Sequence, residues 1–213
     1  MINQTPHPSK NALPRGVPKG AHKVSDFNSE IGERLRALIQ RQGRTLQGVA
    51  AISGLSEKTL SGLTEGKITP TINLLWKLAN ALGVPVGSFI STRYRPGMYV
   101  LRQSDRKVIT SDDKQFTSRI LFPYDAKRLV EFYELTIAPR HAVNSEAHVP
   151  GTLESLVVVR GQIALTVGKE PKQSLREGDA TVFEGDVPHR YHNLGSSEAL
   201  LYLVMSYLND IEA

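Results

Sequence analysis

The hydrophobic pattern of this chain changes its period once, and that change restricts the folds open to it. From Asn28 to Ile90 the apolar residues recur at helical spacing, whereas beyond residue 115 they fall in short runs separated by turn residues. A helical period and a strand period need different packing layers, so we predict an α+β multidomain chain. Its N-terminal domain should be all-α and its C-terminal domain all-β. The 213 residues suit one or two domains.

Four helices and a final turn are expected in the N-terminal half. Val86 and Phe89 suggest the turn. The residues expected to cap the helix N-termini are Asn28 or Ser29, Thr45, Ser56, and Thr69 followed by Pro70. The glycines expected to end the helices are Gly43, Gly54, Gly66 and Gly83.

Short β-type runs fill the C-terminal half and predict an antiparallel barrel or sandwich. The expected strands are Ser118–Phe122, Leu129–Ile137, Leu153–Arg160, Gln162–Val167, Ala180–Phe183 and Leu200–Ser206. Residues 91–115 are polar and predict a linker, with one strand at Met98–Leu101. Residues 1–27 are rich in Pro, Gly and Lys and predict a disordered basic arm.

Composition narrows the function further. The chain has no Cys, which excludes disulfides, thiolate nucleophiles and Cys-ligated zinc. It has no apolar run of membrane-spanning length and no signal-peptide layout at its start, so we expect a cytoplasmic protein that does not bind membranes. The net charge is +5, and residues 93–213 carry 15 basic and 16 acidic residues. All the excess positive charge therefore lies in the helical half, which favours an anionic polymer as partner.

The second and third helices carry the residues that a helix-turn-helix needs. Ala50 is small enough for the two helices to approach each other, and Gly54 tolerates the positive φ of the turn. The apolar residues expected between the helices are Val49, Leu55 and Leu60. The N-terminal end of the third helix, residues 56–61, would then point outward and could enter the major groove of DNA.

This pattern resembles the XRE-type (lambda-repressor-like) helix-turn-helix family over roughly residues 30–90. The matching residues are Thr45-Leu46, Val49-Ala50, Gly54-Leu55-Ser56, Leu60-Ser61, Gly66, Pro70, Leu75 to Ala79 and Leu82-Gly83-Val84. The sequence departs from the family at Gly48 and Thr64. The resemblance implies base contacts from Lys58, Thr59 and Ser61, with Glu57 as a cytosine reader. It implies phosphate contacts from Arg44, Thr45, Ser56 and Lys67. The alternatives are a purely capping Ser56 and solvated surface roles for Arg44 and Lys67.

Two stretches of the β half carry candidate metal ligands. One runs from Ser145 to Glu154 and the other from Gly178 to Asn193, and His148, Glu154 and His189 could converge on one ion. Such imidazole and carboxylate ligands suit Zn, Ni, Mn or Fe(II). If no metal binds, these side chains would contact an organic ligand or water.

The same stretches resemble the two signature motifs of the cupin family, a double-stranded β-helix or jelly-roll barrel. The matching residues are Pro150-Gly151-Thr152, Glu154, Gly161, Gly178-Asp179, Pro188-His189 and Asn193, and the resemblance covers about residues 115–208. By analogy His148, Glu154 and His189 would be the metal ligands. The family usually has a second His two positions before His148, where this chain has Glu146.

The order of the two domains resembles small bacterial regulators of the XRE–cupin group. This resemblance implies a transcription regulator, a repressor by preference, that forms a homodimer through residues 116–210. It would bind a pseudo-palindromic operator in double-stranded DNA through residues 28–90. Its barrel would sense a small-molecule effector, such as an amino acid or a derivative. The effector would change the placement of the two DNA-binding domains of the dimer through the linker. A non-enzyme is expected.

Two alternatives stay open on the sequence. One is a metal-dependent cupin enzyme tethered to DNA. The other is an antitoxin-like DNA-binding protein whose second domain binds a protein partner.

Overall fold

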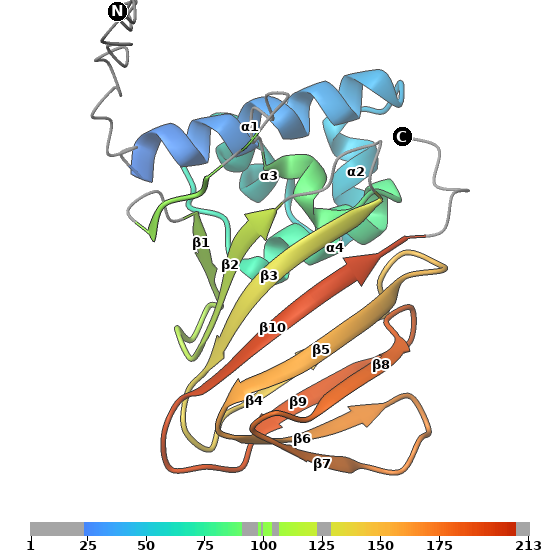
Figure 1. The fold of residues 1–213 in the computed structure, drawn as a ribbon. Helices are drawn as coiled ribbons and strands as arrows, with labels where there is room; N and C mark the ends of the chain where they lie inside the picture. The colour runs from blue at the N-terminus through green and yellow to red at the C-terminus, as the bar shows by residue number, and fades with distance from the viewer. Residues whose placement is uncertain (1–23, 91–97, 99, 104–106, 123–128, 208–213) are drawn as a thin grey trace, which may run out of the picture.

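A computed structural model describes residues 24–90, 98, 100–103, 107–122 and 129–207. Most of the expected arm (1–27) and much of the expected linker (91–115) lie outside these residues. Figure 1 shows the helices gathered at one end of a β barrel. No helix in the described part of the chain is long and apolar enough to cross a membrane.

The expected helices are confirmed. They are α1 (Val24–Arg41), α2 (Leu46–Ser53), α3 (Glu57–Thr64), α4 (Ile72–Leu82) and the 3₁₀ turn η1 (Val86–Phe89). Apolar side chains at helical spacing are buried on each helix, for example Ile31 and Leu35 of α1 and Leu75 and Leu78 of α4. These side chains fill the interior of the helical bundle, and that burial is the main stabilising term for such short helices.

Two of the expected N-caps are confirmed and two are wrong. The Thr45 and Ser56 side chains accept from the backbone N–H groups of Gly48 and Thr59, both at 3.0 Å. Helix α1 begins at Val24, before the expected Asn28 or Ser29 cap, and so includes the end of the expected arm. Helix α4 is capped by Thr71, not Thr69. The reason is tertiary, since the Thr69 hydroxyl instead accepts from the buried Asn28 amide at 3.0 Å, joining this loop to α1.

The C-terminal half forms two antiparallel sheets. The six-stranded sheet has the order β1-β2-β3-β10-β5-β8, and the four-stranded sheet has the order β4-β9-β6-β7. The strands are β1 (Val108–Thr110), β2 (Phe116–Phe122), β3 (Val130–Ile137), β4 (Ala142–Ser145), β5 (Leu153–Arg160), β6 (Gln162–Val167), β7 (Gln173–Arg176), β8 (Ala180–Glu184), β9 (His189–Asn193) and β10 (Ala199–Ser206). The α+β architecture with an all-β barrel is therefore confirmed.

Six of these strands match the predicted runs closely, and β1, β4, β7 and β9 were not predicted. The missed strands are short or polar, as in Gln173–Arg176, so they lack the apolar run that signals a strand. The strand expected at Met98–Leu101 is wrong, because the described residues there have no strand pairing. The strand of this region is β1, which pairs with β2 through Ile109 and Ser118.

The two domains pack directly against each other. Asn80 of α4 donates to the Ala147 carbonyl at 2.8 Å, and the Gly87 N–H of η1 donates to Glu131 of β3 at 2.6 Å. Lys107 also pairs with Glu30 of α1 at 2.7 Å. One continuous cluster of buried apolar residues extends from the helices into the barrel. The helical domain is thus seated on the barrel as well as joined to it along the chain.

Candidate metal centre and nucleic-acid interface

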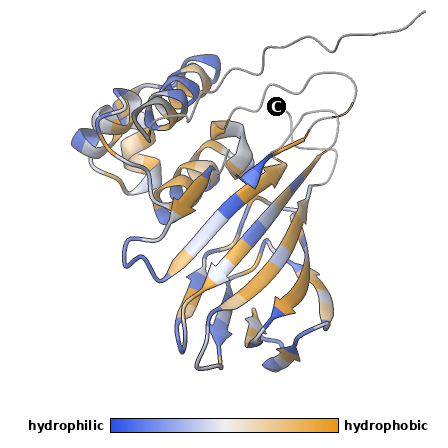
Figure 2. Ribbon diagram, turned by 60° about the vertical axis from the view of Figure 1, so that its left-hand side comes forward, coloured by the Kyte–Doolittle hydropathy of each residue, from blue (hydrophilic) through white to orange (hydrophobic). Residues whose placement is uncertain are grey.

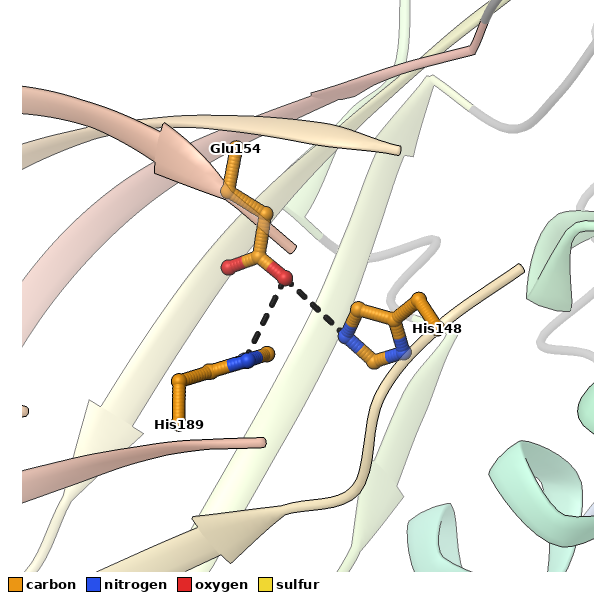
Figure 3. A group of neighbouring side chains, drawn as sticks. All are labelled: His148, Glu154 and His189. Carbon is orange, nitrogen blue, oxygen red and sulfur yellow. Dashed lines mark ion pairs between the residues drawn. The ribbon is translucent and has the colours of Figure 1, made fainter. Parts of the chain in front are cut away.

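Three predicted ligands meet inside the barrel. His148 lies between β4 and β5, Glu154 is the second residue of β5, and His189 begins β9. Figure 3 shows the carboxylate of Glu154 between the two imidazoles. Glu154 Oε1 lies 2.9 Å from His148 Nε2 and 3.3 Å from His189 Nε2. All three side chains are buried, with relative exposures of 8%, 1% and 4% in sequence order.

The donor set fits a divalent ion. One nitrogen or oxygen atom from each residue lies within 4.8 Å of the others. Glu154 Oε1 and His189 Nε2 are buried, yet neither has a hydrogen-bond partner among the described residues. Unsatisfied buried polar atoms are costly, and a shared cation would satisfy both. Two imidazoles and one carboxylate form a facial set that leaves coordination positions open.

Surrounding groups fix how these ligands are presented. Nδ1 of His189 lies 2.9 Å from the Val187 carbonyl, and because a carbonyl only accepts, Nδ1 carries the proton and leaves the Nε2 lone pair free. The Tyr191 hydroxyl donates to Glu154 Oε2, which leaves Oε1 facing the histidines. Gly185 lies against the carboxylate, and a Cβ atom there would come within 2.9 Å of Oε1.

The electrostatics favour the forms that bind a metal. Burial alone would raise the pKa of Glu154, but the adjacent His148 and His189 and the Tyr191 hydroxyl together lower the pKa below its ordinary value. Burial lowers the pKa of His189, and the nearby Glu154 only partly opposes this effect. The carboxylate is therefore ionised and the His189 imidazole is neutral at neutral pH, as ligands must be.

Glu146 does not take the place of the missing histidine. It is exposed, whereas the preceding Ser145 is buried with its hydroxyl 3.4 Å from His148 Nε2. Strand alternation through β4 explains this, because Val143 and Ser145 face the interior. The candidate centre therefore has three protein ligands among the described residues.

Two features of the barrel interior were not predicted from the sequence. The Trp76 ring of α4 lies edge-on to His148, with ring centroids 5.4 Å apart. Glu131 is fully buried and accepts hydrogen bonds from the Tyr133 and Tyr207 hydroxyls, both at 2.6 Å. Burial raises the pKa of Glu131, although these hydrogen bonds and the Gly87 N–H oppose the rise. The contact of Trp76 with His148 and those of Tyr207 and Gly87 with Glu131 join distant parts of the chain, and no local pattern signals them.

The predicted DNA-contacting residues lie at the surface. Those that are exposed are Arg44, Thr45, Ser56, Glu57, Lys58 and Lys67. Thr59 and Ser61 are half-buried, and Leu60 between them is fully buried in the bundle. Ser56 caps α3, as its alternative role required, and its hydroxyl also lies 2.8 Å from that of Thr59. Lys67 pairs with Glu65 at 2.5 Å. The N-terminal end of α3 thus points away from the bundle core.

Known proteins share both halves of this architecture. Residues 35–89 match the helix-turn-helix family, and residues 133–205 match the cupin domain family. The chain is 33% identical over 179 residues to the HTH-type transcriptional regulator SutR of Escherichia coli K12, covering 83% of this chain and 94% of that protein. It is 24% identical over 172 residues to the HTH-type transcriptional regulator PuuR of the same organism, covering 80% and 91%.

A crystal structure agrees with these relatives. The HTH_3 family transcriptional regulator from Vibrio cholerae superposes with a TM-score of 0.68 at 26% identity, covering 87% of this chain and 99% of that chain. The similarity spans the helical bundle and the barrel together, and the SutR match covers nearly the whole of that relative. The chain therefore belongs to the XRE-type helix-turn-helix transcriptional regulators that carry a C-terminal cupin domain.

Proposed function

We propose that this protein is a ligand-responsive regulator that binds a specific operator in double-stranded DNA, with repression as its action. The observation that carries the proposal is the outward N-terminal end of α3, with Ser56, Glu57 and Lys58 exposed at the start of a helix whose Leu60 and Leu63 anchor it in the core. A helix held in this way presents its first turn to the major groove without unfolding.

The exposed residues of this face would make two kinds of contact with DNA, one kind with base edges and the other with phosphates. Lys58 reaches from the first turn of α3 and is suited to guanine O6 and N7. Arg44 precedes the cap of α2 and is suited to phosphate, as is the N–H-rich start of that helix. Thr59 and Ser61 are half-buried and closer to the bundle, so they would read bases only at the groove floor.

Lys58→Ala is expected to weaken operator binding by about 1–3 kcal/mol and to relax base preference at one position, because a base contact is lost. Arg44→Ala should instead weaken binding to all sequences and lower the salt slope by about 1. Gel shifts with the upstream region of the protein's own gene, at several salt concentrations, measure both effects. Lys169→Ala, an exposed barrel residue, is the matched control. The absence of any sequence-selective shift in the unmodified protein would refute the proposal.

We also propose that the protein is a homodimer, joined through the outer face of the six-stranded sheet. The large apolar side chains exposed on this face include Phe122, Val130, Leu153, Val157 and Val182. Strand register places them on one face. One row of pairs runs from Phe122 to Val182 through Phe132, Val204 and Ser155. Figure 2 shows hydrophobic residues along these strands. An apolar face of this extent suits a protein partner. A palindromic operator needs two DNA-binding domains related by two-fold symmetry, so we propose that the partner is a second copy of this chain.

Val157→Glu is expected to convert the dimer to monomers, because it places a charge in the middle of the apolar face. Sedimentation velocity at micromolar concentration measures the change. Ser174→Glu adds the same charge to the opposite sheet, where Ser174 is exposed on β7, and should leave the mass unchanged. If the unmodified protein sediments as a monomer, or if the two variants behave alike, the interface is misplaced.

The barrel would hold a divalent ion, with Zn, Ni, Mn and Fe(II) as candidates, on His148, Glu154 and His189. Once bound, the ion would supply an open coordination position that can take the carboxylate oxygen or amine nitrogen of a small metabolite. An amino acid or a derivative is the effector class that suits such a site. Glu154 would orient the site through its bond from Tyr191, and the buried walls would exclude bulk water.

One observation supports a second candidate, a metal-dependent enzyme. Two histidines and one carboxylate are also the ligand set of non-haem iron oxygenases. Oxygen uptake by the Fe(II)-loaded protein, in the presence of candidate metabolites, separates this activity from sensing alone.

A further inference from the structure

Helix α4 of the helical domain touches the segment that carries His148. Trp76 and Asn80 are four residues apart and therefore lie on one face of α4. The Trp76 ring lies edge-on to His148, with ring centroids 5.4 Å apart and an interplanar angle of 62°. Asn80 donates from Nδ2 to the carbonyl of Ala147, the residue just before His148, at 2.8 Å. A helix of the DNA-binding half thus forms part of the wall of the candidate metal centre.

The same segment is held to the barrel on its other side. The backbone N–H of His148 donates to the Gly185 carbonyl at 3.0 Å, and Gly185 itself lies against the Glu154 carboxylate. His148 is therefore the one candidate ligand among the described residues that is clamped between the barrel and the helices. Glu154 and His189 lie within the barrel strands β5 and β9.

The opposite side of α4 is part of the helix-turn-helix domain. Leu75, Leu78 and Leu82 are buried in the bundle, and α4 packs against α2, which in turn packs against α3. Close-packed interiors do not absorb displacements locally, so a small shift of α4 moves its neighbours as rigid elements. A physical path of direct contacts thus joins His148 to the helix whose first turn would enter the groove.

We propose that Trp76 and Asn80 couple occupancy of the His148, Glu154 and His189 centre to the position of the helix-turn-helix. The Nε2 atom of His148 already faces Glu154 Oε1 at 2.9 Å, and an ion bound by both atoms would replace this direct contact. Any adjustment of the imidazole as the ion enters would change its edge contact with Trp76 and shift the backbone that Asn80 holds. The signal passes through this interface and does not need the 91–115 linker. This inference rests on the proposed metal site and on the proposed DNA binding.

The chain supplies its own reporter, because Trp76 is its single tryptophan. We expect Zn²⁺, a closed-shell ion, to change the Trp76 emission of the full-length protein, with a midpoint equal to the Kd from calorimetry. His189→Ala should abolish this change. In the unmodified protein we also expect Zn²⁺ to alter operator affinity by a factor of about 5 or more in gel shifts, and operator DNA to alter Zn²⁺ affinity by the same factor.

Asn80→Ala keeps the fluorophore, and Trp76→Leu removes the ring contact. In both variants the factor by which Zn²⁺ changes operator affinity should fall toward 1, whatever change each variant makes in the Zn²⁺ affinity measured without DNA. Lys77→Ala, at an exposed position on the same helix, is the control and should keep the full factor. Melting curves followed by circular dichroism establish that each variant is folded, and Trp76→Phe provides a conservative ring replacement that should restore part of the factor.

The possible failures are distinguishable. If calorimetry detects no Zn²⁺ binding, the metal site and this coupling both fall. If no operator shift occurs either with or without Zn²⁺, the proposed DNA binding falls and the coupling with it. If Zn²⁺ binds but leaves the Trp76 emission and the operator affinity unchanged, the coupling alone is overturned. It is also overturned if Asn80→Ala and Trp76→Leu both keep the unmodified factor.

Discussion

His189→Ala is expected to weaken Zn²⁺ binding by about 100-fold or more, because it removes one of three protein ligands and losing even an outer-shell partner costs about 10–100-fold. The imidazole is pre-set for this role by the Val187 carbonyl, which holds the proton on Nδ1 and directs the Nε2 lone pair inward. Glu154→Gln should have a comparable effect, since it keeps the side-chain size but removes the negative charge. Isothermal titration calorimetry of protein stripped with a chelator measures both.

The matched control for this experiment is His192→Ala. His192 lies on the same strand, β9, but pairs with Ala164 and Ala142 and is only half-buried outside the cluster. Its removal should change the affinity by less than about threefold, in contrast to a ligand loss. Zn²⁺ at 100 times its Kd should also stabilise the unmodified protein by about 2.7 kcal/mol. Equal losses from the two histidine variants, or no binding of any candidate ion by the unmodified protein, would leave the cluster as a polar lining for an organic ligand.

Local signals were sufficient for the helices, for six of the ten described strands and for the candidate ligands. The helical period around Leu35 and Leu75, the hydroxyl caps at Thr45 and Ser56, and the glycine that ends α4 act over a few residues. The His148, Glu154 and His189 set follows from the two motifs that resemble the cupin signatures. Glu154 and His189 lie on strands, and His148 lies in the segment between β4 and β5. The structure brings these three residues together, as the resemblance implied.

Contacts across the domain boundary could not be predicted in this way. Asn80 and Ala147 are 67 residues apart, and Gly87 and Glu131 are 44 apart. Tertiary context also overrode a local signal at Thr69, whose hydroxyl bonds to Asn28 and leaves Thr71 to cap α4. A tertiary contact also explains the glycine at position 32. A Cβ atom there would lie 2.5 Å from the Leu63 carbonyl oxygen, so the crossing of α1 over α3 requires glycine. Helical periodicity does not distinguish such a glycine from any other small residue.

The contacts beside the predicted linker also could not be predicted from the sequence. A polar, Pro/Gly-rich stretch favours two domains that move independently, and the sequence gives no sign that α4 and η1 rest on the barrel. The structure describes contacts there at the candidate metal centre, through Trp76 and Asn80, and at Glu131, through Gly87. A helical domain that is seated on the barrel can respond to small movements at the candidate site. A helical domain on a free tether would need a large change in linker conformation.

The Glu131 contact is expected to contribute strongly to stability, and Glu131→Ala should lower the free energy of unfolding by about 3 kcal/mol or more. Three buried donors lose their acceptor in this variant, namely the Tyr133 hydroxyl, the Tyr207 hydroxyl and the Gly87 N–H. Each unsatisfied buried group costs about 1–3 kcal/mol. Glu198→Ala, which breaks only an exposed ion pair with Arg160, is the control and should change stability by less than about 0.5 kcal/mol. Urea unfolding at one fixed protein concentration measures both.

The pH dependence of this contact has a definite sign. Burial raises the pKa of Glu131 above its ordinary value, so the folded state binds this proton more tightly than the unfolded state. The stability that the protonated carboxyl contributes is complete below the ordinary pKa of Glu and is lost as the pH rises through the raised pKa of the folded protein. Glu131→Gln cannot ionise, so it does not lose this stability as the pH rises. Its free energy of unfolding relative to the unmodified protein should therefore increase between about pH 4 and neutral pH. A decrease over that range would mean that the three donors hold the carboxyl ionised and that its folded pKa is depressed, in which case Glu131 joins η1 to the barrel as a buried charge.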